Sequence, residues 1–241
     1  MYKGSVQSEW QSTAEGQSIM QHFYNAKSSG RKLFGILEQP VVHASIEEVR
    51  YKIVLLGKSG VGKTWTVARL AGVAGNNTVG SCQTFETVGI RITDIYWPVK
   101  IRDKVILFKL TVWDPGSHSF KKYTHIALAC QDKADMQILF FSYNDASSLN
   151  DLVPLINKNV KKDDDNLPGL LIIGTRHLSK TEISKSEVQE FQMKNNVNIM
   201  SLPVITSCSN ELSKVSPILN AICEQLWYRD QQYIMNQNVK V

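Results

Sequence analysis

The pattern of hydrophobic and polar residues changes near residue 50. From there on, short apolar runs of strand length alternate with segments whose apolar positions recur at helical spacing. We predict strands at Tyr51–Leu56, Val88–Trp97, Val105–Trp113, Gln137–Tyr143, Gly169–Gly174 and Ile199–Thr206. We predict helices at Thr64–Ala71, Phe120–Cys130, Ser147–Asn159, Ser184–Lys194 and Val215–Tyr233. Alternating strands and helices indicate a mostly parallel sheet covered on both faces.

Two consecutive strands of this series have no helix between them. Val88–Trp97 and Val105–Trp113 both alternate, and the segment Pro98–Lys104 connects them. A connection this short favours antiparallel pairing. The expected fold is therefore α/β, with roughly six strands in a mostly parallel sheet, one antiparallel edge strand and helices on both faces.

Residues 1–49 have a different character, because they are polar and lack regular alternation. Ser12–Glu15 fits a capping box, in which Ser12 begins a helix and Glu15 reaches back to it. Apolar residues at helical spacing follow over Ile19–Phe23, and a second apolar patch occupies Leu33–Leu37. We predict a partly helical extension that packs on its own domain or on a partner. The main domain then spans 50–234, followed by a short tail at 235–241.

Composition excludes several classes of protein. Among the 241 residues, 43% are hydrophobic and 20% charged, which is enough for a core and argues against wholesale disorder. No apolar run approaches the ~18 residues of a spanning helix. The sequence shows no signal peptide, myristoylation site or prenylation site. We expect a cytoplasmic protein without a direct lipid anchor.

Charge and cysteine content narrow the classes further. The net charge of +5 is small, and the basic residues are scattered rather than gathered into a stripe, so we expect no nucleic-acid partner. Cys82, Cys130, Cys208 and Cys223 have no pair at metal-site spacing. They are expected to be thiols in a reducing compartment.

A phosphate-binding loop lies between the first strand of the main domain and its helix. The segment matches G-x-x-x-x-G-K-[ST] at every fixed position. Backbone N–H groups of such a loop bind phosphate oxygens, the lysine holds the β- and γ-phosphates, and the hydroxyl meets Mg²⁺. The nucleotide-binding residues are then Gly57, Lys58, Ser59, Gly60, Val61, Gly62, Lys63 and Thr64.

Two further segments offer ligands for the metal. Asp114 ends an apolar strand, where Mg²⁺ beside such a loop needs a second anchor, although Asp114 also precedes Pro-Gly and could simply form a turn. Thr87 opens the preceding strand, at the position of a switch segment that meets Mg²⁺ and the γ-phosphate. We predict Thr64, Thr87 and Asp114 as metal ligands, with Gly116 beside the nucleotide.

The order of these motifs resembles that of Ras-superfamily small GTPases, and the loop and Thr-Val-Gly-Ile segments look Rab-like. The chain resembles more closely the Rem/Rab-like small GTPase family of the ciliogenesis and planar polarity effector complex. That match rests on Gly4–Gly16, Leu33–Pro40, Tyr96–Lys100 and Glu224–Trp227. The resemblance implies a small G domain of the P-loop NTPase class that binds GTP or GDP with Mg²⁺.

The same resemblance implies a cellular role. The expected partners are Fuzzy and Inturned, the proteins of the effector complex, and the expected process is membrane trafficking and exocytosis toward the basal body during ciliogenesis. Locations would be the cytoplasm, the cytoskeleton and the cilium basal body. Contact with membrane would come through the partners.

The sequence departs from the Ras pattern where hydrolysis is concerned. D-x-x-G-Q is expected, but the chain reads Asp114-Pro115-Gly116-Ser117-His118 and offers no glutamine. The catalytic residues are therefore unknown, and Ser117 and His118 are the available candidates. Without a group that orients water, hydrolysis should be slow at most.

The base-reading motif departs further. Where [NT]-K-x-D is expected, the chain has Thr175, Arg176, His177 and Leu178. Leu178 accepts neither guanine hydrogen bond, and two bonds to a charged group at ~1.5–3 kcal/mol each amount to roughly two to four orders of magnitude. Arg176 can still stack on a base, and the backbone of Ser207, Cys208 and Ser209 can meet its carbonyl.

Three functions remain open. The first is a GTP-dependent binding switch with slow hydrolysis. The second is a pseudo-GTPase scaffold with weak or no nucleotide selectivity, which Leu178 favours. The third is a P-loop kinase or ATPase, although the sequence has no arginine-rich insertion for a lid.

Overall fold

The structure is a computed structural model of the 241-residue chain. It describes residues 6–7, 9–23, 32, 34, 38–41, 46–72, 86–160, 167–177, 181–203 and 211–239.

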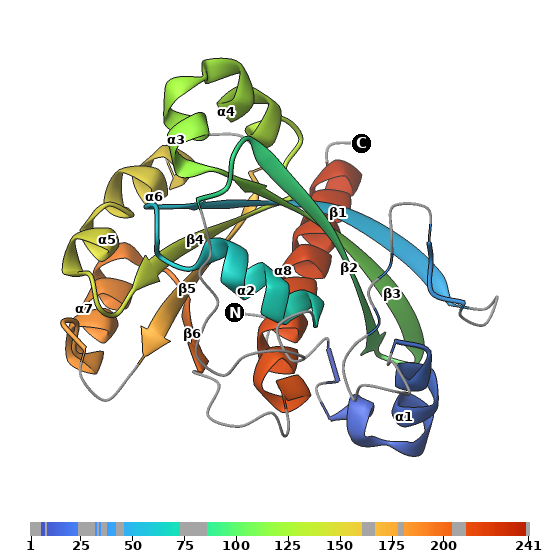
Figure 1. Cartoon of the computed structure of the whole chain (residues 1–241). Coiled ribbons are helices and arrows are strands. Elements are labelled where there is room, and N and C mark those ends of the chain that lie inside the picture. Colours follow the sequence, from blue (N-terminus) through green and yellow to red (C-terminus); the bar gives the residue numbers. More distant parts are fainter. Residues whose placement is uncertain are drawn as a thin grey trace.

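A six-stranded sheet forms the centre of the protein (Figure 1). Its strands are β1 (Glu47–Gly57), β2 (Ile90–Ile101), β3 (Lys104–Pro115), β4 (Met136–Ser142), β5 (Gly169–His177) and β6 (Ile199–Pro203). They lie in the order β2-β3-β1-β4-β5-β6. The β2–β3 pair is antiparallel and every other pair is parallel. The predicted α/β fold is confirmed, including the antiparallel strand at the edge.

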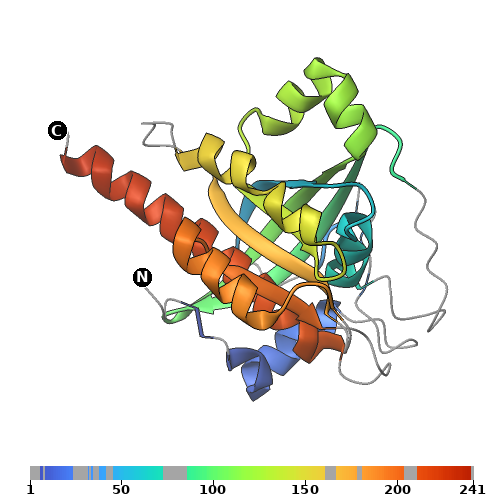
Figure 2. The ribbon, with the colours of Figure 1, turned by 90° about the vertical axis from the view of Figure 1, so that its left-hand side faces the viewer.

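Helices cover both faces of the sheet (Figures 1 and 2). They are α1 (Ala14–Met20), α2 (Lys63–Ala71), α3 (Ser117–Lys122), α4 (Thr124–Gln131), α5 (Ala146–Asn150), α6 (Val153–Val160), α7 (Lys185–Asn195) and α8 (Glu211–Val239). Alternate residues of β1 face two cores: Ile53 packs with α2 and α8, whereas Val54 packs with α4 to α7. The C-terminal part of α8 projects beyond the sheet in Figure 2. It continues through Val239, into the segment that the sequence predicts as a tail.

Two predicted helices are each divided in the structure. The segment Phe120–Cys130 contains a break at Tyr123, whose extended backbone separates α3 from α4. The segment Ser147–Asn159 is divided between α5 and α6. Pro154 explains the second division, because it lacks the N–H that a continuous helix would need there, whereas the first turn of a new helix tolerates it. Local apolar spacing did not reveal either break.

The predicted connection Pro98–Lys104 is also wrong. Pro98 lies inside β2, opposite Leu107, and only Arg102 and Asp103 form the turn. An edge strand tolerates proline because one side of its backbone needs no partner in the sheet. The two strands are consequently longer than predicted, and they bring residues 90–101 alongside 104–115.

The N-terminal helix begins one residue later than predicted. Ser12 belongs to a short 3₁₀ helix, and Thr13 is the N-cap of α1, with its hydroxyl accepting from Gly16 N at 3.2 Å. Glu15 does not close a capping box. Its carboxylate instead accepts from Trp10 Nε1 at 2.9 Å and from Lys100 Nζ at 2.7 Å.

The described part of the extension packs on its own domain. Val6 forms a bridge with Ile101 at the outer edge of β2, and α1 lies below the end of the β2–β3 hairpin in Figure 1. Phe34 sits edge-on to Tyr96 with ring centroids 5.1 Å apart, and Phe23 belongs to the same apolar cluster. The described apolar side chains of the extension therefore pack on the face of the β2–β3 hairpin that presents Tyr96 and Leu107.

A buried polar network also holds the extension in place, and it provides a test. Trp97 Nε1 donates to Asn220 Oδ1 at 2.8 Å, and Gln11 Nε2 donates to the same oxygen at 3.0 Å. Asn220→Leu removes the acceptor of a buried indole, which costs about 1–3 kcal/mol of unfolding free energy and lowers Tm by about 2–4 °C per kcal/mol. Thermal unfolding measures this. Gln11→Leu is the control, with a smaller loss expected; equal losses would show that Trp97 does not depend on Asn220.

Candidate nucleotide-binding site

The loop between β1 and α2 has the backbone of an anion-binding turn. Gly57, Gly60 and Gly62 all have positive φ angles, of 144°, 78° and 95°. A Cβ at Gly57 would lie 2.6 Å from the carbonyl oxygen of Phe140, so only glycine fits there. Gly62 then precedes the first residue of α2, which directs the N-terminus of that helix toward the loop.

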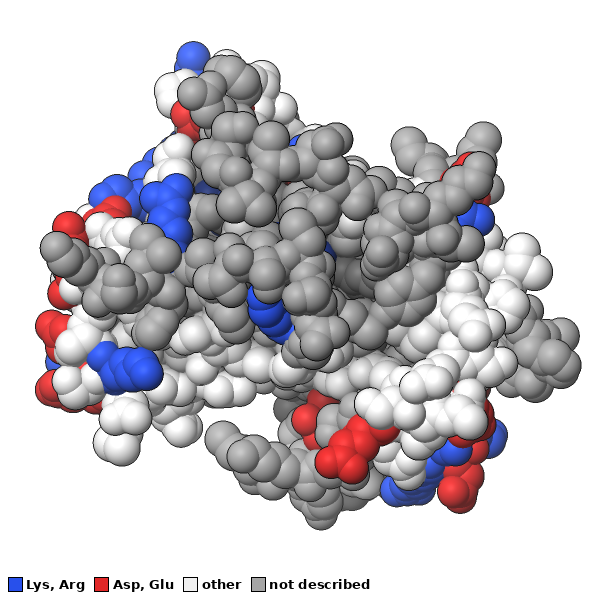
Figure 3. Space-filling view, turned by 60° about the horizontal axis from the view of Figure 1, so that its bottom comes forward, with Lys and Arg blue, Asp and Glu red and all other residues white. Residues whose placement is uncertain are grey.

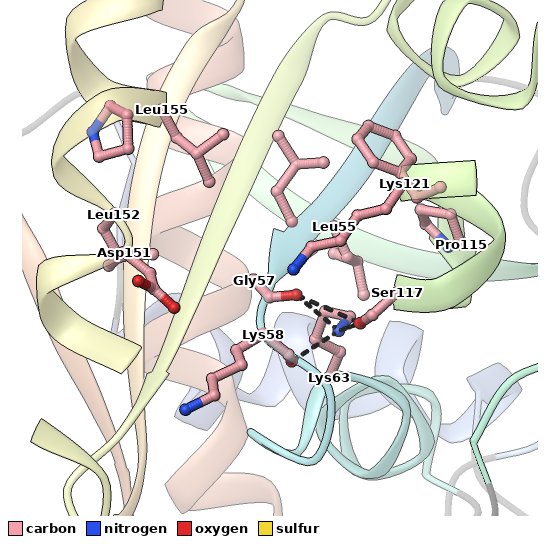
Figure 4. A pocket seen from close by; sticks show the side chains of 13 residues that line it. Leu55, Gly57, Lys58, Lys63, Pro115, Ser117, Lys121, Asp151, Leu152 and Leu155 are labelled. Carbon is pink, nitrogen blue, oxygen red and sulfur yellow. Dashed lines mark hydrogen bonds between the residues drawn. The ribbon is translucent and has the colours of Figure 1, made fainter. Parts of the chain in front are cut away.

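Lys63 is buried beneath this loop. Its ammonium donates to the carbonyls of Gly57 and Lys58, both at 3.0 Å, and to Ser117 Oγ at 2.9 Å (Figure 4). Burial lowers the pKa of Lys63, and nearby Lys121 adds to that effect, while the charges of Asp114 and Glu86 oppose it. The site thus contains a desolvated cation whose hydrogen bonds go to neutral oxygens, which a phosphate oxygen would replace with a charged partner.

The three predicted metal ligands come together beside Lys63. Thr64 Oγ1 lies 3.0 Å from Thr87 Oγ1 and donates to Asp114 Oδ2 at 2.5 Å. Asp114 is only 2% exposed, and its Oδ1 is buried without a hydrogen-bond partner among the described residues. Burial raises the pKa of this carboxyl.

This donor set fits Mg²⁺. Two hydroxyls and a carboxylate are hard oxygen ligands, and the unpartnered Oδ1 is an acceptor that a cation would satisfy. Over the described residues there is no cluster of three or more His, Cys, Asp or Glu side chains that could hold a metal ion. Mg²⁺ bound to triphosphate and water needs few protein ligands, so Thr64, Thr87 and Asp114 are sufficient.

The segment after Asp114 separates the two catalytic candidates. The Ser117 hydroxyl turns toward Lys63, whereas the side chain of His118 is exposed and only its backbone N–H is used, donating to Glu86 Oε1 at 3.2 Å. Gly116 N donates to Gly89 O at 2.8 Å, so this glycine ties the segment to the residues after Thr87. Ser117 is therefore at the site and the ring of His118 is not.

Thr175 supports the loop from the end of β5. Its hydroxyl is buried, and its one O–H is shared between Val61 O at 2.5 Å and Phe141 O at 3.2 Å. The next residue, Arg176, is exposed and has a positive φ of 57°. Thr175 thus acts on the loop backbone, which the sequence motif alone did not show. The other predicted base-contacting residues, Ser207, Cys208 and Ser209, lie outside the described residues, as does Leu178.

An ion pair beside the loop was not predicted. Lys58 Nζ lies 2.8 Å from Asp145 Oδ2 and 2.6 Å from Ser147 Oγ. The bond from Lys58 lowers the pKa of Asp145 to about 2. Asp145 is also the N-cap of α5, with its side chain accepting from Ser148 N. The capping position could have been recognised in the sequence, but a partner 87 residues away could not.

The Thr175 contact yields a prediction for the site. Thr175→Val keeps the shape of the side chain but removes the O–H that Val61 O and Phe141 O share, and should lower the unfolding free energy by about 1–3 kcal/mol. Because the loop loses its support, nucleotide affinity should also fall by about tenfold. Both are measured by thermal unfolding and by titration with fluorescent GTP. Thr175→Ser, which keeps the hydroxyl, should restore most of the affinity; a variant that binds like Thr175→Val would contradict this role.

A glycine loop that follows a strand of a mostly parallel sheet, a buried lysine, and a cluster of two threonines and one aspartate beside that lysine define a P-loop small G domain. The Ras family matches residues 52–225, and the chain belongs to the Ras family.

Similar proteins extend this relationship over most of the chain. It is 33% identical to Ciliogenesis and planar polarity effector 2 of Xenopus laevis, over 92% of each chain. For the proteins of the same name from Danio rerio and Homo sapiens the identity is 31%, covering 93% and 92% of this chain and 87% and 89% of theirs. The predicted resemblance to this group of small GTPases is confirmed.

Proposed function

We propose that the protein is a GTP-dependent binding switch. The observation that carries this proposal is the meeting of Thr64, Thr87 and Asp114 beside Lys63, because it joins the loop to two segments that respond to nucleotide in G domains. GTP with Mg²⁺ would be held by the loop, by Lys63 and by these three oxygen ligands. The negative charge of the nucleotide would order the segment that contains Thr87 and the segment that follows Asp114. These two segments would then form the surface that a partner binds.

The linkage between the two segments is visible in backbone contacts. Gly116 N donates to Gly89 O, and Gly89 N donates to Ser119 Oγ at 3.2 Å. Gly89, two residues after Thr87, is therefore hydrogen-bonded to both Gly116 and Ser119. Val88, next to Thr87, is 94% exposed, as expected of a segment that presents apolar surface to a partner.

The cellular role is proposed from the relatives. They are named as effectors of ciliogenesis and planar polarity, and we propose the same process here. Fuzzy and Inturned are the proposed partners, in membrane trafficking toward the basal body. No helix of the described residues is long and apolar enough to cross a membrane. Acidic and basic side chains are interspersed on the described part of the face in Figure 3, so docking through partner proteins agrees with the charge distribution.

Hydrolysis is proposed to be slow. The segment Asp114–His118 contains no glutamine, and the side chain of His118 is exposed. The hydroxyl of Ser117 is already used, because it accepts from Lys63 Nζ and donates to Gly57 O. Weak orientation of the attacking water lowers the rate by orders of magnitude in this class. GTP would then stay bound until a partner protein stimulates its hydrolysis or its release.

The second candidate is a scaffold that does not select guanine. Leu178 favours it, and so does the pairing of Lys63 with its own loop carbonyls, which satisfies the ammonium without any anion. In that case the fold alone would present the partner surface. The two candidates differ in a single measurable property, the nucleotide content of the protein.

That property is tested by denaturing protein purified with Mg²⁺ and separating the released nucleotides by ion exchange. Stoichiometric GTP or GDP supports the switch. Empty protein that also takes up no fluorescent GTP supports the scaffold. ATP in the supernatant, with phosphoryl transfer to an acceptor, would contradict both and favour a kinase or ATPase.

Asp114 gives a prediction that involves pH and metal. Its carboxyl pKa is raised above 3.8 by burial, so the folded nucleotide-free protein binds more protons than the unfolded chain between 3.8 and the raised pKa. Stability should therefore fall as pH increases through that window, and Asp114→Asn should remove this slope. The same variant should weaken Mg²⁺-dependent GTP binding by about tenfold or more. Tm measured against pH, and GTP titration with and without Mg²⁺, check the two effects; an unchanged slope would contradict the assignment.

A further inference from the structure

The C-terminal part of α8 leaves the body of the domain and exposes apolar side chains. It projects beyond the sheet in Figure 2. Ile234 is 51% exposed and Met235 is 57% exposed. Between Asp230 and Lys240 the sequence has no charged residue, although a helix face in water usually carries charges. An apolar and uncharged helix end is typical of a surface that another molecule covers.

A cavity of about 490 Å³ lies beside this helix end. One wall is the turn of the β2–β3 hairpin, and α8 forms the other. The wall from α8 consists of Trp227, Tyr228, Gln231, Gln232 and Met235. Ile234 belongs to the same face of the helix, because it follows Trp227 by seven positions, which is close to two turns. The cavity and the exposed apolar residues therefore form one surface, which we call the α8 groove.

The charges that line the α8 groove are balanced. Arg102 and Lys104 at the hairpin turn are matched by Asp103 and by Glu47 at the start of β1. None of the four forms an ion pair with a residue that the structure describes. A partner with a strong charge of either sign would leave two of them facing a like charge. A second copy, related by a two-fold axis, can instead place its carboxylates against the cations.

The middle of the helix wall is also suited to a second copy. Gln231 and Gln232 lie between the aromatic and the thioether side chains of this wall. A carboxamide both donates and accepts hydrogen bonds, so it can pair with the same group of another chain. If the axis passes Gln231, an antiparallel helix places Met235 of one copy opposite Trp227 of the other, because each lies four positions from the axis. Contacts between sulfur and an aromatic ring are favourable.

We propose that the α8 groove binds a second copy of this chain, with the two α8 helices antiparallel and the two-fold axis near Gln231. The groove adjoins Glu47, the first residue of β1, whereas the phosphate-binding loop begins at the other end of that strand. Eleven residues of strand separate the two by roughly 35 Å. The dimer therefore leaves the candidate nucleotide site open, and it does not depend on the proposed function.

The oligomeric state of the full chain, measured by analytical ultracentrifugation, tests the proposal. A reversible dimer with a Kd of about 1–100 μM is expected, because one helix end and one hairpin turn give an interface at the small end of the usual range. Ile234→Lys should weaken the dimer at least about tenfold, since a two-fold interface loses the apolar contact twice and gains two like charges. A wild-type chain that stays monomeric at about 500 μM would overturn the proposal.

Tyr233→Lys is the matched control. Tyr233 is 45% exposed, but it follows Trp227 by six positions and so lies on the side of α8 away from the groove. Lysine is compatible with the C-terminal end of a helix, and unfolding curves verify that both variants fold. Tyr233→Lys should dimerise like wild type. Equal dimerisation of the two lysine variants would mean that the groove is not the interface.

The position of the axis is tested by cross-linking. In Gln231→Cys the two new thiols face each other across the axis, so oxidised glutathione should produce a disulfide-linked dimer on a non-reducing gel. Tyr233→Cys should not cross-link above the background of wild type, whose four native cysteines are kept in both variants. Cross-linking of Gln231→Cys no greater than that of Tyr233→Cys would contradict the proposed arrangement.

An exchange of charges tests the pairing across the axis. Arg102→Glu with Lys104→Glu makes the groove acidic, and Glu47→Lys with Asp103→Lys makes it basic. Each double variant should dimerise about fivefold more weakly than wild type, because like charges then face each other. A mixture of the two should form a heterodimer about as tightly as wild type. A mixture that associates no better than either variant alone would show that these charges do not meet, and the proposed dimer would be wrong.

Discussion

Lys63→Met is expected to weaken GTP binding by about 100-fold or more. The variant keeps the length of the apolar stem but removes an ammonium that lies under the loop, where it would make two charge-assisted bonds to phosphate. Such bonds are worth about 1.5–3 kcal/mol each. Titration with fluorescent GTP and Mg²⁺ measures the loss. The same variant should fail to bind a partner in a GTP-dependent manner.

Lys63→Met should weaken GTP binding, but it should not destabilise the nucleotide-free protein at neutral pH. The pKa of Lys63 is lowered by burial, so the fold disfavours the charged form that the unfolded chain carries. By linkage, wild-type stability should rise as pH increases from the lowered pKa toward 10.5, and Lys63→Met should lose that rise. At neutral pH the variant should unfold at an equal or higher temperature than wild type.

Lys58→Met is the matched control, since it lies in the same loop but its ammonium pairs with Asp145. It should retain most of the affinity for GTP. If Lys63→Met binds GTP as well as this control does, Lys63 does not hold the phosphates and the switch proposal fails. If Lys63→Met is simply unfolded, Thr64→Asn gives a second test of the same site.

Local signals explain why so much of the site was predictable. The loop from Gly57 to Thr64 carries its function in eight consecutive residues, and the strand before it and helix after it have clear periodicities. Asp114 could be placed because the carboxyl ends of neighbouring parallel strands meet at one edge of the sheet. Thr87 was placed by the order of the motifs, and it lies at the same edge because it precedes β2, which runs antiparallel to β3. Their hydrogen bonds to the Thr64 region confirm that geometry.

The parts that could not be predicted depend on contacts between distant residues. The Thr175 hydroxyl reaches Val61 across 114 positions, and Glu15 leaves its predicted capping role for Lys100. Tertiary partners override local preference in such cases. The sequence identified Glu15 and Thr175 as polar residues near a helix start and a strand end. Their actual hydrogen-bond partners, Lys100 and Val61, are distant in the sequence and are set by the packing of the fold.

The candidate site is therefore complete on its phosphate side and altered on its base side. The loop residues, Lys63 and the Thr-Asp cluster that the motifs predict lie together in the structure. At the end of β5, Thr175 supports the loop, but the following Arg176 is exposed and Leu178 replaces the acidic residue of the family motif. In the proposed switch, phosphate binding and base selection would depend on different residues, so one substitution on the base side should restore selection for guanine without changing the loop.

Leu178→Asp is expected to increase affinity for GTP by roughly two to four orders of magnitude. The position follows β5, whose last residues are fixed to the phosphate-binding loop through Thr175. A carboxylate there would accept two hydrogen bonds from guanine, at about 1.5–3 kcal/mol each. Affinity for ATP should not rise, because adenine lacks the two donors. Parallel titrations with fluorescent GTP and ATP measure the change in selectivity.

Inosine triphosphate and Leu178→Asn provide the controls. Inosine lacks the exocyclic amine of guanine, so Leu178→Asp should increase its affinity by about half the GTP gain on a logarithmic scale. Leu178→Asn, which is neutral, should give a smaller increase than the aspartate for both nucleotides. An equal gain for ATP and GTP would indicate a general effect of the substitution. No gain for any nucleotide would mean that the base does not reach this position, and the scaffold would then be the better account of the protein.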